Sequence, residues 1–151
     1  MSDAGRSLEL VVEFSVPGRA ASRGSKRAFR TKSGRINLVD NKRSYEYMDA
    51  IKKCARAAMA GRPAVDGPVL LEWSAYFARP KCHYRKAGLK PDAPIYYTQT
   101  PDCSKIVRAI EDAMTGVVYG DDKQIVGYLP ELNKHWCEGE PWTLIKVWKL
   151  R

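Results

Sequence analysis

The stretch TPDCSKIVRAIEDAMTGVVYGDD, residues 100–122, contains the clearest element boundaries in the chain. Apolar residues recur at helical spacing from about 103 to 115, and a glycine follows, which is a common helix stop. Asp102 precedes this segment, and Asp121 and Asp122 follow it after a short apolar run. The pattern therefore predicts a helix with carboxylates near both of its ends.

Around this helix, runs of β-branched and aromatic residues are bounded by turn signals, and a second helical periodicity lies among them. The predicted helices cover 44–60 and 103–115, and the predicted strands cover 7–16, 35–40, 68–80, 123–128 and 143–150. The order β-β-α-β-α-β-β predicts one α/β (α+β) domain over residues 1–151, with two main helices packed on a mixed β-sheet.

The chain carries 26 Lys and Arg against 17 Asp and Glu, which gives a formal net charge of +9. This balance favours a polyanionic partner, and nucleic acid fits better than a membrane because no basic amphipathic helix stands out. The alternative is a basic protein that binds nothing anionic. No apolar run is long enough to span a bilayer and the N-terminus resembles no signal peptide, so we expect a cytoplasmic location.

The four cysteines form no CxxC pair, so we expect reduced thiols. Cys82-His83 together with His135 and Cys137 would offer zinc ligands in principle. Their spacing is not that of a usual zinc site, which disfavours this interpretation.

The positive charge is concentrated in two segments. Residues 18–35 carry seven basic side chains and no acidic one, with small residues that let a phosphate backbone approach. A second basic group lies in the proline-punctuated segment 81–100. A solvated flexible loop is the alternative for the first segment. We predict DNA contacts from Arg19, Arg23, Lys26, Arg27, Arg30, Lys32, Arg35, Lys81, Arg85, Lys86 and, on the predicted helix, Lys105.

The aspartates admit two interpretations. Asp102 follows a proline and is a typical N-cap, and Asp121-Asp122 follows a glycine and is typical of a turn. The same three carboxylates would suit Mg²⁺ if they met at one edge of the sheet. A helix of this length spans about 20 Å, whereas the few extended residues after it recover only about 10–14 Å. Convergence therefore requires a tilted helix or a second subunit that contributes one side of the site.

The stretch from Pro101 to Ile125 resembles the signature of the RusA family of Holliday junction resolvases. That signature begins with P-D-x-D, continues through a helix that ends in D-A-L-x-G, and closes with D-D-x-Q. The segments FSVPGRAASRGSKRAF, RPKCHY and APIYYTQTPD also resemble the family. The chain matches the signature at Pro101, Asp102, Lys105, Arg108, Ala109, Asp112, Ala113, Gly116, Tyr119, Asp121, Asp122, Gln124 and Ile125.

The resemblance implies a mixed α/β fold and a homodimeric, Mg²⁺-dependent endodeoxyribonuclease. Such an enzyme resolves four-way DNA junctions by paired symmetric nicks in recombination and repair. The resemblance assigns catalytic and metal-binding roles to Asp102, Asp122 and the adjacent Asp121, and a catalytic role to Arg108, where the family often has lysine. A phage origin, which would place the protein in the cytoplasm of a bacterial host, suits so short a resolvase.

The chain departs from the family pattern at Ser104, which replaces the second aspartate of P-D-x-D. A hydroxyl is neutral and a weaker Mg²⁺ ligand, so metal affinity should fall unless Glu111 or Asp121 compensates. One alternative to a working nuclease is therefore a catalytically weakened or inactive relative that binds branched DNA. A basic protein that assembles on RNA is another, but it leaves the spacing of the aspartates unexplained.

In the nuclease hypothesis, Mg²⁺ held by Asp102 and Asp122 orients a water for in-line attack on a phosphodiester. Arg108 could stabilise the charge that develops on the phosphate. The alternatives are that it only positions the phosphate or that it pairs with Asp112. It cannot act as a base, because guanidinium stays protonated. A homodimer presents two matching sites to a two-fold symmetric junction. The candidates for its interface, or for the core, are Trp136, Trp142 and Trp148.

Overall fold

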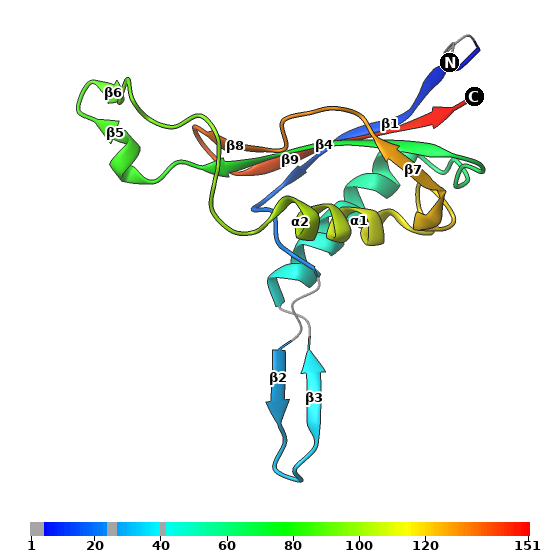
Figure 1. Cartoon of the computed structure of the whole chain (residues 1–151), viewed down its shortest axis with the longest axis horizontal. Coiled ribbons are helices and arrows are strands. Elements are labelled where there is room, and N and C mark those ends of the chain that lie inside the picture. Colours follow the sequence, from blue (N-terminus) through cyan, green and yellow to red (C-terminus); the bar gives the residue numbers. More distant parts are fainter. Residues whose placement is uncertain (1–4, 24–26, 40–41) are drawn as a thin grey trace.

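A five-stranded mixed β-sheet forms the centre of the protein (Figure 1). The computed structural model describes residues 5–23, 27–39 and 42–151. Strands β1 (Leu8–Pro17), β9 (Trp142–Leu150) and β4 (Val69–Ala78) lie in that order, and each runs antiparallel to its neighbour. Strands β7 (Ile125–Tyr128) and β8 (Lys134–Cys137) both run parallel to β4 along its other edge.

β7 and β8 share one edge of β4 but pair with different parts of it. β7 pairs with Val69–Leu71, and β8 pairs with Ala75–Ala78. Between these two ladders, the Asn133 side chain donates a hydrogen bond to the Trp73 carbonyl at 2.7 Å. The two strands are therefore attached to β4 by separate sets of hydrogen bonds.

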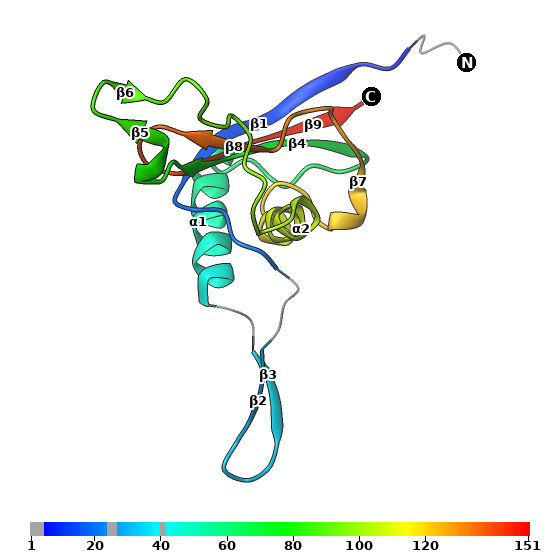
Figure 2. The ribbon, with the colours of Figure 1, turned by 60° about the vertical axis from the view of Figure 1, so that its left-hand side comes forward.

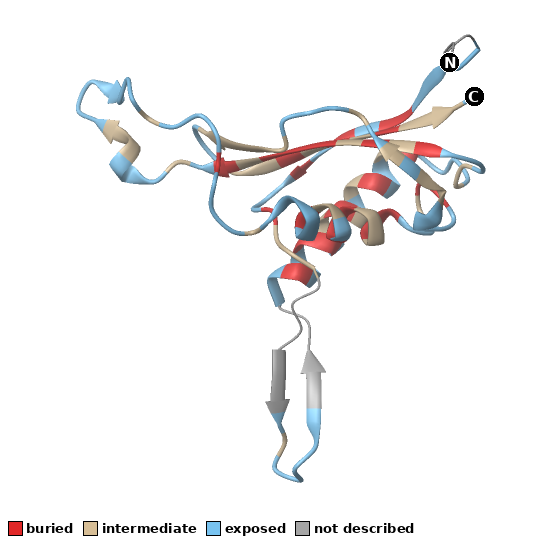
Figure 3. Ribbon diagram, viewed as in Figure 1, coloured by how far each residue is buried: buried red, intermediate tan, exposed pale blue. Residues whose placement is uncertain are grey.

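Two helices, α1 (Lys42–Met59) and α2 (Cys103–Met114), cover one face of the sheet (Figures 1 and 2). Every second residue of β4 points toward them, as the two-residue period of a strand requires. Figure 3 shows that the buried residues gather where the helices meet the sheet. Among the described residues, no helix is both long and apolar enough to cross a membrane. The buried residues of β4 and α2 include Val69, Leu71, Trp73, Ala75, Phe77, Ile106, Ala109, Ile110, Ala113 and Met114.

The opposite face of the sheet has no helix over it in the described part of the chain (Figure 1). Its side chains are half-buried and mix apolar with charged groups. Trp148 Nε1 donates to Glu72 Oε2 at 2.9 Å, and Lys146 Nζ lies 3.9 Å from Glu72 and 3.6 Å from Glu13. These contacts give an otherwise apolar sheet face a polar surface.

Two hairpins project from this body (Figures 1 and 2). One consists of β2 (Arg27–Arg30) and β3 (Ile36–Val39), which pair antiparallel and extend away from the helices. The other consists of β5 (Tyr84–Arg85) and β6 (Gly88–Leu89), which follow a short 3-10 turn and lie beyond the end of the sheet. The hairpins therefore point in different directions, and the space between them forms an open angle on one side of the body (Figure 1).

The mixed sheet and both helices confirm the fold class predicted from the sequence. The strand predicted over 35–40 exists, but it pairs with β2 in the first hairpin and does not join the main sheet. β2 itself lies inside the basic segment, where charged residues masked the strand pattern. β8 was missed because its sequence KHWC has no apolar alternation, and all four of its residues are half-buried.

Replacing Ile110 with alanine tests the packing of α2. Ile110 is fully buried, so Ile110→Ala should lower the free energy of unfolding by about 2–5 kcal/mol. Ile95→Ala is the control, because Ile95 is 63% exposed and its truncation should change stability by about 0.5 kcal/mol or less. Urea denaturation followed by circular dichroism measures both. Equal effects of the two variants would contradict the burial of Ile110.

Candidate active site

Asp102 stands immediately before α2 with an extended backbone. Within the described structure its side chain makes no capping hydrogen bond to the helix, although the residue occupies the N-cap position. The first turn is closed by backbone bonds instead, from the amides of Lys105 and Ile106 to the Asp102 carbonyl at 3.1 and 3.0 Å. The carboxylate is exposed, so its oxygens are open to a ligand.

The turn that carries Asp121 and Asp122 is held by the side chain of Gln124. Its Oε1 accepts from the amides of Gly120 and Asp121 at 2.9 and 3.0 Å. Its Nε2 donates to two backbone carbonyls, those of Val65 and Gly67, at 2.9 and 3.0 Å. Asp121 accepts from the amide of Lys123 at 2.9 Å, which lowers the pKa of that carboxyl. The half-buried side chain of Gln124 therefore fixes the positions of Asp121 and Asp122 relative to the loop that precedes β4.

Four carboxylates gather where this turn meets the second half of α2. Partial desolvation raises the pKa of Asp122, and the carboxylates of Asp121 and Asp112 raise it further. Burial likewise raises the pKa of Glu111, with added repulsion from Asp122 and Asp112 and an opposing effect of the Tyr128 hydroxyl and Arg108. The negative charge is therefore crowded at this end of α2.

Two contacts from elsewhere in the chain hold this acidic group, which consists of Glu111, Asp112, Asp121 and Asp122. Arg23 Nε lies 2.7 Å from the carboxylate of Asp112. The Tyr128 hydroxyl donates to Glu111 Oε1, and this bond and desolvation raise the pKa of Tyr128 to about 12. The acidic group is thus stabilised from β7 on one side and from the N-terminal basic segment on the other.

The single chain does not bring Asp102 to this acidic group. The ten residues from Asp102 to Asp112 correspond to about 15 Å along a helix. Lys105 and Arg108 occupy the exposed surface of α2 between the two ends, and Ser104 is exposed on its first turn. In the ranges that the structure describes, no three His, Cys, Asp or Glu side chains are grouped closely enough to hold a metal ion together.

The donor chemistry of the acidic group nevertheless suits a divalent cation. Carboxylate oxygens are the ligands that hard cations prefer, and Mg²⁺ keeps several waters, so few protein ligands suffice. The raised pKa values of Asp122 and Glu111 arise in part from carboxylate repulsion, which a bound cation would relieve. Asp122, with Asp112 and Asp121 beside it, is the best-placed residue to hold such an ion.

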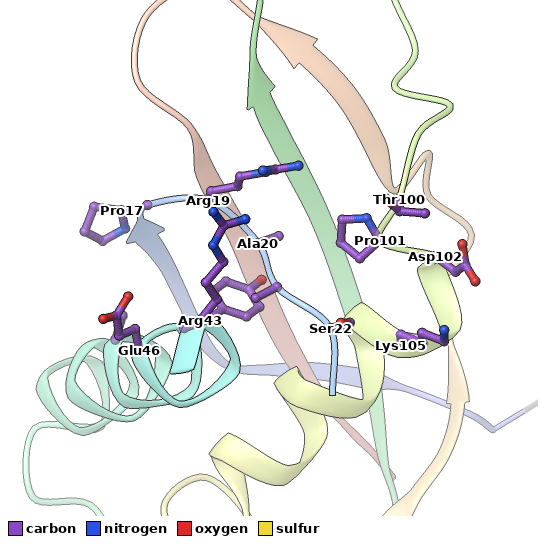
Figure 4. A pocket seen from close by; sticks show the side chains of 14 residues that line it. Pro17, Arg19, Ala20, Ser22, Arg43, Glu46, Thr100, Pro101, Asp102 and Lys105 are labelled. Atoms are coloured by element: carbon purple, nitrogen blue, oxygen red, sulfur yellow. The ribbon is translucent and has the colours of Figure 1, made fainter. Parts of the chain in front are cut away.

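A cavity opens on the Asp102 side of α2, between the end of β1 and the first turns of α1 (Figure 4). Arg19 and Lys105, both predicted to contact DNA, line it together with Arg43. Asp102 lies at its edge beside Thr100 and Pro101. The cavity and the acidic group therefore lie at opposite ends of the same helix.

The other basic residues predicted to bind DNA divide into three classes. Those on the hairpins are exposed, whereas Arg23 is two-thirds buried and engaged by Asp112 in the free chain. Lys26 lies outside the described residues, and only the backbone of Arg27 is described. The exposed group comprises Arg30, Lys32, Arg35, Lys81, Arg85 and Lys86.

Sequence reasoning missed three features of this region: the Arg23–Asp112 ion pair, the Tyr128–Glu111 hydrogen bond and the cavity. Each joins segments that are far apart in the chain, and helical periodicity carries no information about such partners. In the structure Asp112 is half-buried, as a charged side chain with a partner often is, but this burial cannot be read from the sequence.

Glu111→Gln tests the charge repulsion in the acidic group. The pKa of Glu111 is raised in the folded state, so its contribution to stability is present below its ordinary value of 4.5 and is lost as pH rises through the folded value. Glutamine keeps an acceptor for Tyr128 but never ionises. The variant should therefore gain stability relative to wild type as pH rises above about 4.5, as chemical denaturation would show. Glu138→Gln, at an exposed turn, should show no such trend.

Gln124→Ala tests the clamp on the acidic turn. The loss of four hydrogen bonds should lower the free energy of unfolding by about 1–3 kcal/mol and speed hydrogen exchange at the Gly120 and Asp121 amides. Gln99→Ala removes a glutamine side chain at an exposed position and is the matched control. Unchanged exchange at Gly120 and Asp121 in Gln124→Ala would contradict the clamp.

Comparison with known proteins adds an independent line of support. The uncharacterised protein YqaN of Bacillus subtilis (strain 168) is 26% identical over 120 residues, which are 76% of this chain and 82% of that protein. The family described as "Endodeoxyribonuclease RusA" matches residues 17–148, a range that includes both helices, the acidic turn and the cavity. The chain therefore belongs to the RusA endodeoxyribonuclease family.

Proposed function

We propose that this protein is a divalent-metal-dependent endonuclease that resolves four-way DNA junctions by paired nicks, with Mg²⁺ as its metal and a homodimer as its working form. Membership of an endodeoxyribonuclease family supports the cleavage of DNA. The observation that carries the site assignment is the position of Asp102, which lies uncapped at the edge of a cation-lined cavity. Glu46, the other carboxylate that lines this cavity, lies 3.8 Å from Lys42 within α1.

The shape of the molecule supports DNA binding at this place. α2 begins on the side of the body that faces the angle between the two hairpins (Figures 1 and 2). Exposed basic side chains line both hairpins, so a phosphate backbone lying in the angle would meet positive charge on two sides. Contacts of this kind lose affinity steeply as salt concentration rises. These residues are Arg30, Lys32 and Arg35 on one hairpin, Arg85 and Lys86 on the other, and Lys81 in the 3-10 turn before it.

The residues along α2 divide the chemical work. If a helix movement or a second chain brings Asp102 to Asp121 and Asp122, a divalent cation held by them would lower the pKa of a bound water and offset charge on the phosphate. Lys105 and Arg108 lie between the two carboxylate groups, where they would hold the phosphate in place. Arg108 stays protonated at all working pH values, so it stabilises negative charge and does not accept the proton of the water.

Asp102→Asn should reduce cleavage of a synthetic four-way junction by about 100-fold or more, because the amide removes a charged metal ligand. Junction affinity should change by about three-fold or less, since most of the binding free energy comes from phosphate contacts. Asp49→Asn, at an exposed position on α1, is the control and should cleave at the wild-type rate. Denaturing gels measure nicking with and without Mg²⁺, and gel shifts measure binding.

Three results would contradict this proposal in different ways. Tight junction binding without nicks in the wild-type protein would leave a binding protein, as the Ser104 departure allows. Equal affinity for a four-way junction and for a linear duplex would contradict the proposal that the protein is a junction resolvase. Retained metal-dependent cleavage in Asp102→Asn would exclude Asp102 from the site.

Mixing two inactive variants locates the metal site within a dimer. Asp102 and Asp122 are separated along α2 in the single chain, so a site that uses both requires either a helix movement or a second chain. Asp102→Asn mixed with Asp122→Asn should regain cleavage if one site draws these carboxylates from different chains. An inactive mixture would place both on one chain. Refolding the variants together before the assay ensures that their chains exchange.

A further inference from the structure

The cavity beside Asp102 has a volume of about 630 Å³, within the range of about 300–1,000 Å³ that small-ligand sites occupy. It is bounded by the segment that follows β1, by the first half of α1 and by the start of α2 (Figure 4). Its size is sufficient for a single nucleotide and far too small for a base pair with two backbones. A ligand within it would lie directly beside the proposed catalytic carboxylate.

The cavity is lined by three basic side chains and by the carboxylates of Glu46 and Asp102. Arg19 and Arg43 approach it from the end of β1 and the start of α1, and Lys105 lies across from them on α2 (Figure 4). Arg19 is held in place, because its Nη2 donates to the Tyr97 hydroxyl at 3.0 Å and its guanidinium lies 5.8 Å from the centre of the Phe77 ring. The Tyr97 hydroxyl in turn donates to the Thr100 carbonyl at 2.6 Å, which ties Arg19 to the residues before Asp102.

Part of the interior is apolar, formed by alanines from two elements, Pro101 and Tyr47. Polar and charged groups supply the rest of the lining. Tyr47 is 3% exposed, and its hydroxyl is hydrogen-bonded to Thr143 Oγ1 at 2.9 Å, so that polar group already has a partner. A flat, uncharged ring system suits such an interior, and inorganic phosphate alone would leave it empty. The alanines are Ala20, Ala21 and Ala50.

We infer that this cavity binds one unpaired nucleotide of the DNA substrate, with the base in the apolar part of the interior and its phosphate at Arg19 and Lys105. A base that is still paired cannot enter, so occupancy selects DNA whose strands are already open, as they are at a branch point. The phosphate on the far side of the bound nucleotide is then presented to Asp102. The inference rests on the proposed function only in taking its ligand to be DNA.

The test compares two single-stranded oligonucleotides of equal length in metal-free buffer, one of thymidine and one of abasic nucleotides. Both carry the same phosphates, so their difference in affinity reports the base alone. Fluorescence anisotropy should show that wild type prefers thymidine by about five-fold or more, the size expected for burial of one base. Ala50→Leu fills the cavity from a half-buried helical position and should bring the ratio of the two affinities close to one.

Ala57→Leu is the matched control, because residue 57 lies on the same side of α1 two turns along, is exposed and does not line the cavity. It should keep the wild-type ratio. If Ala50→Leu fails to fold, as circular dichroism would reveal, Ala21→Leu fills the cavity from the opposite wall and should give the same loss.

Three outcomes would overturn the inference: a ratio near one in wild type, a preserved ratio in the cavity-filling variants, and no binding of either oligonucleotide. None of them depends on cleavage. A wild-type protein that prefers thymidine but never nicks a four-way junction would refute the proposed function and leave the nucleotide site standing. A protein that nicks junctions with a ratio near one would do the reverse.

Discussion

The burial of one side of α2 against the sheet and α1 determines where every candidate functional group lies. Ile106, Ile110 and Ala113 are fully buried, and this fixes the rotation of the helix about its axis. A rotation by a single residue is about 100°, which would carry charged side chains into the core at a cost of several kcal/mol. Lys105, Arg108 and Asp112 are therefore directed outward by the apolar side of the same helix. The chemistry of α2 follows from its packing.

The free protein keeps carboxylates crowded together within a chain of strongly positive net charge. The pairing of Arg23 with Asp112 offsets part of the repulsion, and the Tyr128 hydroxyl satisfies Glu111. Desolvation, together with the repulsion that remains, raises the pKa values of Asp122 and Glu111. A site in this condition binds a cation more readily than one whose charges are fully paired, because the ion removes an unfavourable interaction that already exists.

The sequence was sufficient for features that depend on local periodicity. The spacing of Ile106, Ile110 and Ala113 predicted α2 and its buried side, and the alternation in 68–80 predicted β4. Features that depend on distant partners were beyond it. β8 is half-buried throughout and has no alternation to detect, and the contact of Arg23 with Asp112 joins residues almost ninety positions apart. The cavity has no sequence signal at all, since three separate elements form it.

The pairing of β7 and β8 with different parts of one edge of β4 also bears on unfolding. β7 is joined to β4 through three register pairs at one end, and β8 through four at the other. Since these ladders share no hydrogen bond, loss of the β7 ladder would leave the register pairs between β8 and β4 in place. The turn that carries Asp121 and Asp122 depends on the β7 side of this edge, with the hydrogen bonds of Gln124 beside it. β7 and β8 therefore hold their neighbouring residues to the sheet through different ladders, of three and four register pairs.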